Sequence, residues 1–258
     1  MNIIKIKSSQ GCLGKNKGCE KAPDAIVENL KQFHANENEW EPKFEIDEAE
    51  IAESDLEKTF DSISKKAEEV LDEKTIFLGG DHSITYATVR GFSKKFENPG
   101  VIIFDAHPDA ESDFIPTHED ILRALVNENL IKPENIILLG TRNWHSEEIK
   151  FLKQHKIKYF SMQEISKEGI HDICDSVMSV AKEWGALYVS VDIDVLDPAF
   201  APGTGYPEPG GMASRELIYF LQRMKMLKNF KAADIVEVNP EKDELTAKLG
   251  AKLVIELT

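Results

Sequence analysis

The stretch VIIFDAHPDA at residues 101–110 decides the fold prediction, because an uninterrupted apolar run passes directly into acidic residues and a histidine. Apolar runs without polar alternation are typical of strands buried on both faces of a parallel sheet. Five more such runs occur at residues 3–6, 75–78, 136–139, 187–191 and 235–238. Segments with apolar residues at helical spacing lie among them, at residues 56–71, 85–96, 119–130 and 214–226. The alternation predicts an α/β fold in which helices cover a mostly parallel sheet, as one domain over residues 1–258.

Composition excludes several classes of protein. The chain of 258 residues is 41% apolar and carries a formal net charge of −15, so nucleic acids and anionic membranes are not expected partners. The three cysteines form no close pair, and no apolar run approaches the roughly 18 residues that span a bilayer. A cytoplasmic location is therefore expected. The charge-dense stretches 36–58 and 241–252 are expected to be solvated helices and loops.

Asp105, His107 and Asp109 follow the most apolar of these runs at positions i, i+2 and i+4. Strand alternation places their side chains on one side if the extended conformation continues past the run. Two carboxylates and an imidazole in such a place favour a bound cation, because unpaired buried charge is costly. A solvated acidic loop is the poorer interpretation.

Two further strand ends repeat this pattern. Asp192 and Asp194 lie at i and i+2 after the run 187–191, where two like charges on one face destabilise a strand unless a cation joins them. Asp81 and His82 follow a glycine pair, and the alternative there is a helix cap beside a hydrogen-bonded histidine. Asp197, which precedes a proline, is instead assigned to a turn.

Four aspartates and two histidines favour Mn²⁺, although other divalent ions suit the same ligands. Six ligands exceed the needs of one catalytic ion and suit two ions roughly 3.5–4 Å apart. A water shared by two such ions loses a proton near neutral pH. We therefore expect a site that attracts a cationic electrophile.

Four motifs resemble those of the ureohydrolase family, the arginase and agmatinase group of dinuclear manganese enzymes. They are GGDHS at 79–83, DAHPD at 105–109, SVDIDVLDPAFAPGTGYPEPGG at 190–211 and EVNP at 237–240. The resemblance implies a three-layer α/β/α fold with about eight parallel strands, two Mn²⁺ per subunit, and a trimer or hexamer. It also implies hydrolysis of a guanidino compound to urea and an amine by attack of the shared hydroxide. Agmatine is the expected substrate and putrescine the expected product, and the GTG and PEPGG segments also look more like those of agmatinases.

The resemblance assigns roles to individual residues. It implies that one ion is held by His82, Asp105, Asp109 and Asp192, and the other by His107, Asp105, Asp192 and Asp194. It implies that Glu237 pairs with the guanidinium and that Asp109 or His118 transfers a proton to the leaving amine. For His118 an alternative is a helix start in which Thr117 is the cap and Asp120 the third helical residue.

Three residues bear on the substrate. Tyr206 stands where many relatives carry threonine, and its ring could narrow the pocket or stack on the guanidinium. Glu111 and Asp113 would repel the α-carboxylate of arginine and attract a second ammonium group, unless they are solvated loop acids. The alternatives are arginase, guanidinobutyrase or formiminoglutamase activity at the same site, a single-zinc amide hydrolase similar to histone deacetylases, and a non-catalytic sensor of a cationic metabolite.

Overall fold

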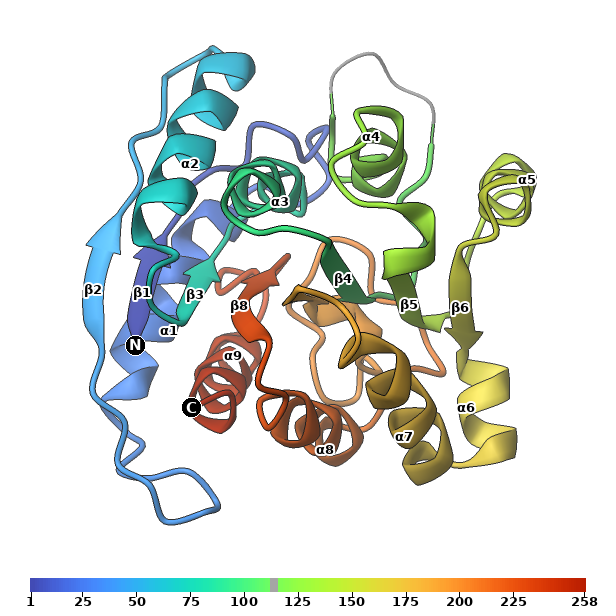
Figure 1. Cartoon of the computed structure of the whole chain (residues 1–258). Helices are drawn as coiled ribbons and strands as arrows, with labels where there is room; N and C mark the ends of the chain where they lie inside the picture. Colours follow the sequence, from blue (N-terminus) through green and yellow to red (C-terminus); the bar gives the residue numbers. More distant parts are fainter. Residues whose placement is uncertain (112–115) are drawn as a thin grey trace.

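The computed structural model describes residues 1–111 and 116–258, which form a parallel sheet of eight strands between two layers of helices (Figure 1). The order of the strands across the sheet is β2-β1-β3-β8-β7-β4-β5-β6. In chain order the strands are β1 (Asn2–Lys5), β2 (Glu45–Glu48), β3 (Thr75–Leu78), β4 (Pro99–Phe104), β5 (Ile136–Thr141), β6 (Lys158–Ser161), β7 (Ala186–Asp192) and β8 (Phe230–Val236). The predicted α/β class and the expected number of strands are confirmed.

The helices form one layer on each face of the sheet, as Figure 1 shows. One layer contains α2 (Leu56–Val70), α3 (Ser83–Lys95), α4 (Ile121–Asn127) and α5 (Ser146–His155). The other contains α1 (Ala22–Leu30), α6 (Met162–Glu168), α7 (Ile170–Ala181), α8 (Ser214–Met224) and α9 (Glu244–Glu256). Each layer buries its own apolar cluster against the sheet. Both faces of the central strands are therefore covered, which explains their continuous apolar sequences.

The six predicted strands are all present, whereas β2 and β6 were not predicted. Both are edge strands, and the four residues of β2 are exposed, so neither segment needs an apolar sequence. The expectation of helices and loops over 36–58 is wrong at β2. The stretch 241–252 is also not simply solvated, because most of it belongs to α9, which buries Ala247 and Ala251.

Two predicted boundaries near the site are also corrected. α4 begins at Ile121 rather than at residue 119, and β8 ends at Val236 rather than at 238. Glu237 is consequently the first residue after its strand. In the part of the chain that the structure describes, no helix is long and apolar enough to cross a membrane.

The sheet order determines where the site forms. Strands β3, β8, β7 and β4 are consecutive neighbours, and all their carboxyl ends lie at the same edge. Ligands of open α/β sheets bind at this edge. The residues that follow these four strands are therefore brought together, although they are far apart in the sequence.

Candidate metal centre

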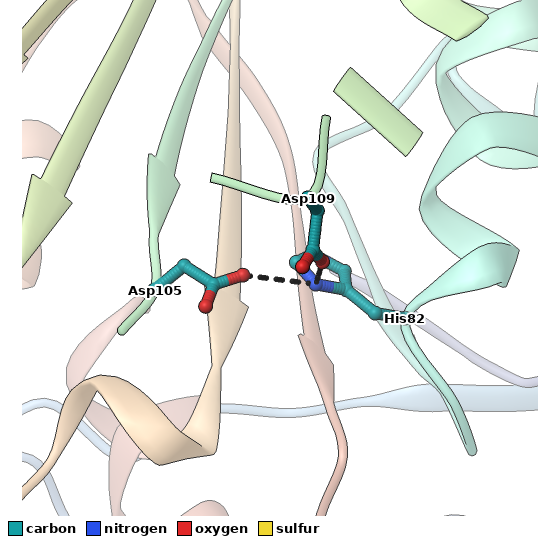
Figure 2. Close-up of side chains that lie close together, drawn as sticks. All are labelled: His82, Asp105 and Asp109. Atoms are coloured by element: carbon teal, nitrogen blue, oxygen red, sulfur yellow. Dashed lines mark ion pairs between the residues drawn. The ribbon is translucent and has the colours of Figure 1, made fainter. Parts of the chain in front are cut away.

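The six predicted metal ligands converge at the carboxyl edge of the sheet. His82 precedes α3, Asp105 follows β4 directly, and Asp192 is the last residue of β7. The Nδ1 atom of His82 lies 2.8 Å from Asp109 Oδ2, 3.1 Å from Asp105 Oδ2 and 3.3 Å from Asp192 Oδ2. Figure 2 shows the carboxylates of Asp105 and Asp109 directed at the imidazole of His82. One nitrogen and three oxygens thus surround a first position for a cation.

A second position lies around His107. Its Nδ1 atom is 3.1 Å from Asp194 Oδ2 and 3.5 Å from Asp105 Oδ1. Asp105 therefore presents one oxygen to each histidine, as a bridging carboxylate does. The Oδ2 atom of Asp192 faces His82, whereas its Oδ1 atom accepts a hydrogen bond of 2.8 Å from the backbone N–H of Asp194.

These residues fit a pair of divalent cations. The ligand set of carboxylate oxygens and one imidazole per position suits Mn²⁺ and related ions. Among the described residues, the buried atoms His82 Nδ1 and Asp105 Oδ2 have no hydrogen-bond partner of acceptable geometry, although their neighbours are close. Buried polar atoms are almost always satisfied, so these two atoms indicate a missing positive partner.

The pKa values show the same need for positive charge. Burial raises the pKa of Asp109 to about 8, and the charge of Asp105 adds to this. Burial, followed by the charges of Asp194 and Asp105, raises the pKa of Asp192 well above its ordinary value. Burial alone would lower the pKa of His82, but the surrounding carboxylates raise it well above its ordinary value. The metal-free cluster therefore retains protons that bound cations would displace.

We expect the stability of the metal-free protein to fall as pH rises from 5.5 to 8. A carboxyl group with a raised folded pKa stabilises the fold at low pH, and this contribution is lost as pH rises from about 4, its ordinary value, through about 8 for Asp109. The raised pKa of His82 acts in the same direction. At a concentration a hundredfold above its Kd, Mn²⁺ should raise the free energy of unfolding by about 2.7 kcal/mol, which corresponds to a rise in Tm of roughly 5–10 °C.

Thermal unfolding with chelator and with Mn²⁺, at both pH values, measures this effect. The gain from Mn²⁺ should be larger at pH 8, where fewer protons compete for the ligands. An equal gain at both pH values, or no gain, would contradict the assignment of these side chains as ligands.

The backbone reaches this arrangement by turns rather than by continued strands. β4 ends at Phe104, and Asp109 has a left-handed φ of 49°. Asp194 lies in the 3₁₀ turn Ile193–Val195 that follows β7. The expectation that extended alternation aligns these side chains is therefore wrong, even though the side chains do meet. A non-glycine residue with positive φ is strained, and such strain is often found at functional sites.

The glycine pair before His82 has a specific packing role. A Cβ atom on Gly80 would lie 1.8 Å from the carbonyl oxygen of Ser8, so only glycine lets the N-terminal loop approach here. The carbonyl of Gly80 also accepts a hydrogen bond of 2.8 Å from the backbone N–H of Glu237. The pair therefore joins the N-terminal loop, β3 and β8 beside the metal centre.

Glu237 has a left-handed φ of 62°, and both oxygens of its carboxylate have polar partners. Its Oε1 atom accepts a hydrogen bond of 2.7 Å from the backbone N–H of His82 and lies 3.2 Å from His118 Nδ1. Its Oε2 atom accepts a hydrogen bond of 2.7 Å from Asn16 Nδ2. Burial alone would raise the pKa of Glu237, but His118 and these donors hold it below its ordinary value. The side chain is thus kept as a buried anion.

His118 is buried beside this anion. Burial would lower the pKa of His118, but Glu237 raises it to about 9. The alternative helix start with Thr117 as the cap is wrong, because α4 begins at Ile121 and Asp120 occupies the cap position. His118 therefore lies in the loop before α4, with its Nδ1 atom toward Glu237.

A cavity of about 170 Å³ opens over the cluster. Its lining includes Asp109, Asp192, Asp194 and Glu237 of the site, together with Glu111, Glu119, Glu148 and Tyr206. The Tyr206 hydroxyl donates a hydrogen bond of 2.7 Å to Glu119, and its ring stacks on the imidazole of His118 with centroids 5.8 Å apart. Tyr206 thus forms a wall of the cavity, as one of its two expected roles requires. Asp113, the other expected acid, lies outside the described residues.

Two residues that hold the site were not predicted. The buried Asn16 donates both to the Glu237 carboxylate and to its carbonyl oxygen, and no sequence signal marks it. The guanidinium of Arg142 donates to the carbonyl oxygens of Asp194, at 2.6 Å, and Glu208, at 2.7 Å, which joins the turn after β7 to the loop at residues 202–211. The signal for Arg142 was present, because it directly follows the apolar strand β5 at the same edge of the sheet. Asp197 accepts backbone hydrogen bonds within its loop, as the turn assignment predicted.

The fold and the site together define an α/β protein with a centre for two divalent cations at the ends of parallel strands. The model of the arginase family matches residues 4–258, and the chain belongs to the arginase family. The arginase of Staphylococcus aureus (strain MRSA252) is 37% identical over 197 residues, which are 69% of this chain and 65% of that protein. The match thus spans slightly less than two thirds of that relative.

Two solved structures extend the similarity over the whole fold. The formimidoylglutamase of Bacillus subtilis has a TM-score of 0.94 at 26% identity and covers 99% of this chain and 85% of its own. The arginase of Bacillus subtilis has a TM-score of 0.86 at 27% identity, and the match covers 99% of this chain and 97% of that arginase. The predicted family is thus confirmed. The expected particular likeness to agmatinases is not, because the relatives from Staphylococcus aureus and Bacillus subtilis, which are 37% and 31% identical to this chain, are named arginases.

Proposed function

We propose that this protein hydrolyses a guanidino compound to urea and an amine at a centre of two divalent cations. The observation that carries the proposal is the placement of Glu237. Its buried anion shares one cavity with the cluster of aspartates and histidines. A guanidinium bound to Glu237 would thus present its carbon to that cluster. Membership of the arginase family supports the same reaction class.

The proposed ligand set follows the contacts already described, except that Asp192 is placed at the second ion by the resemblance to the family and not by a contact with His107. One ion would be held by His82, Asp105, Asp109 and Asp192, and the other by His107, Asp105, Asp192 and Asp194. Mn²⁺ is the proposed ion, because carboxylates outnumber imidazoles by two to one in this set. Two bound divalent ions supply ionisation of a water molecule near neutral pH and stabilisation of the negative charge that develops during hydrolysis.

The protein's part begins with orientation of the substrate. Glu237 is the acceptor for the guanidinium N–H groups, and charge-assisted hydrogen bonds of this type are strong and directional. The backbone N–H of His82 and the amide of Asn16 fix the carboxylate before substrate arrives. The substrate therefore meets a preorganised acceptor, which lowers the entropic cost of reaching a reactive geometry.

His118 is the proposed proton donor to the leaving amine. Glu237 raises its pKa to about 9, so the imidazole carries a proton at neutral pH. Its Nε2 atom is buried and has no hydrogen-bond partner among the described residues, with Glu119 Oε1 3.7 Å away. A protonated nitrogen without a partner, directly beside the guanidinium acceptor, is suitable for general acid catalysis. Asp109, which also lines the cavity, is the second candidate for proton transfer.

The proposed substrate is agmatine, which carries a guanidinium at one end and an ammonium at the other. Glu111, Glu119 and Glu148 line the cavity and lie outside the proposed ligand set. Among the described residues, no lysine or arginine lines it, and the basic groups in its lining are histidines, of which His145 pairs with Glu111. A carboxylate at the far end of a substrate would be repelled there, whereas an ammonium would be attracted. Arginine is the second candidate, and the names of the relatives favour it.

Urea release from a substrate panel tests the proposed function. The enzyme, loaded with Mn²⁺ or treated with chelator, would be given agmatine, arginine, guanidinobutyrate and formiminoglutamate. We expect turnover of agmatine that depends on Mn²⁺ and exceeds that of arginine. If arginine were turned over faster than agmatine, arginine would be identified as the preferred substrate in place of agmatine. Tight binding without turnover would identify a sensor, and one bound metal ion per chain would favour a single-zinc amide hydrolase.

Replacing Glu119 by glutamine is expected to change the substrate preference. The amide oxygen can still accept from Tyr206, but the negative charge at the cavity wall is lost. The kcat/KM for agmatine should fall by roughly 3- to 10-fold, since an exposed charge contact contributes about 1 kcal/mol. The value for guanidinobutyrate, which carries a carboxylate at its far end, should rise. Glu147→Gln on α5 is the control, and equal effects of both variants would contradict the proposed recognition.

A further inference from the structure

Asp234 is a buried carboxylate that is not one of the proposed metal ligands and does not line the cavity. Asp234 is in β8, directly beside Ser190 of β7, and is fully buried. Its Oδ1 atom accepts a hydrogen bond of 2.7 Å from the Ser190 hydroxyl. Its Oδ2 atom accepts hydrogen bonds of 2.8 Å from the hydroxyls of Tyr188 and Thr85. Three hydroxyl groups thus satisfy a charge placed in the middle of the sheet.

Such a group is costly where an apolar residue would fill the space. Burying a carboxylate carries a desolvation penalty that hydrogen bonds only partly offset. The surrounding residues of β8 are Ala232, Ala233, Ile235 and Val236, all fully buried and apolar. Packing alone therefore does not explain an aspartate at position 234.

The hydrogen-bond direction connects this carboxylate to His82. A hydroxyl group has one hydrogen, and Ser190 donates it to Asp234. Toward His82 Nε2, which is 3.1 Å away, the Ser190 oxygen can then only accept. The Nε2 atom of His82 must therefore carry a hydrogen. The Nδ1 atom, which faces Asp105 and Asp109, is then the one that offers its lone pair when a cation displaces its proton.

We propose that Asp234 is a positioning residue that acts through Ser190 to fix the ring and the tautomer of His82 for binding the first cation. The inference rests on the metal centre of the proposed function, but not on the identity of the substrate. The relay serves one cation position only. The imidazole of His107 is partly exposed, and its Nε2 atom lies 3.7 Å from Glu208, another loop residue. Partners of this kind commonly contribute about 10- to 100-fold in metal affinity.

The test compares Ser190→Ala and Asp234→Asn with Tyr188→Phe. The Tyr188 variant removes one donor to the same carboxylate but leaves the path to His82 intact. Isothermal titration with Mn²⁺ gives the affinity of each binding step, and metal analysis after dialysis gives the stoichiometry. Circular dichroism of the metal-free proteins checks that each variant is folded. If Asp234→Asn does not fold, Ser190→Ala still tests the relay, because it changes no charge.

We expect one binding step to weaken by about 10- to 100-fold in Ser190→Ala and Asp234→Asn. The other step should be preserved, and Tyr188→Phe should keep both. Unchanged binding in the first two variants would overturn the inference. Equal loss of both steps in all three variants would also overturn it, because it would make Asp234 a packing centre. Two Mn²⁺ bound without urea release would refute the proposed function alone, whereas no Mn²⁺ bound to the unaltered protein would overturn both.

Discussion

Replacing Asp194 by alanine should abolish urea production and leave fewer than two Mn²⁺ bound per chain. The Oδ2 atom of Asp194 lies 3.1 Å from His107 Nδ1, and its Oδ1 atom accepts a hydrogen bond of 3.1 Å from the backbone N–H of Ala106. Alanine would remove both a proposed ligand of the second cation and the contact that holds the loop after β4. Loss of one of two catalytic ions costs about 4 kcal/mol or more, so kcat should fall at least roughly a thousandfold.

Metal analysis and urea release on the same preparation would measure both effects. Asp175→Ala is the matched control. Asp175 lies on α7 and pairs with Arg223, so its replacement removes the same charge far from the site. The control should keep two bound ions and full activity. Full activity of Asp194→Ala would exclude a mechanism that requires two ions.

Replacing Glu237 by glutamine should lower kcat/KM by roughly 30- to 1,000-fold while two ions stay bound. Loss of a buried charged partner costs about 2–4 kcal/mol, which gives this range. The substitution also turns an acceptor into a donor. An amide nitrogen would face the N–H of His82 or the amide of Asn16, so one donor would lose its partner.

Initial rates with agmatine and Mn²⁺ binding would be measured in parallel. Glu241→Gln is the control, since this glutamate lies four residues further along and pairs with the exposed Lys21. If Glu237→Gln kept full kcat/KM, the guanidinium would have to bind elsewhere. If it lost both ions, Glu237 would act on the metal centre rather than on the substrate.

The central strands could be predicted from the sequence, whereas the edges of the sheet could not. Strands β4 and β7 are covered on both faces, so burial forces a continuous apolar sequence on them. β2 has the sequence EIDE and is solvated along its length, so burial imposes no such pattern. A continuous apolar sequence therefore indicates that a strand is buried, and it does not reveal exposed strands that pair at the edges of the sheet.

The residue types of the site could be predicted, but not the geometry that joins them. Asp105 and Asp192 stand out because a charged residue at the end of a buried apolar run is costly unless something compensates its charge. Their meeting depends on turns, such as the left-handed Asp109, that alternation does not predict. Asn16 contacts Glu237 across 221 positions of sequence, and nothing local marks it. Asp234 did carry a signal, since a lone aspartate in a buried apolar strand requires partners.

The most direct test is a crystal structure of the protein grown with Mn²⁺ and measured at the manganese absorption edge. We predict two anomalous peaks roughly 3.5–4 Å apart. One should be ligated by His82 and Asp109, the other by His107 and Asp194, with Asp105 bound to both. A single peak, no peak, or peaks away from these side chains would contradict the account.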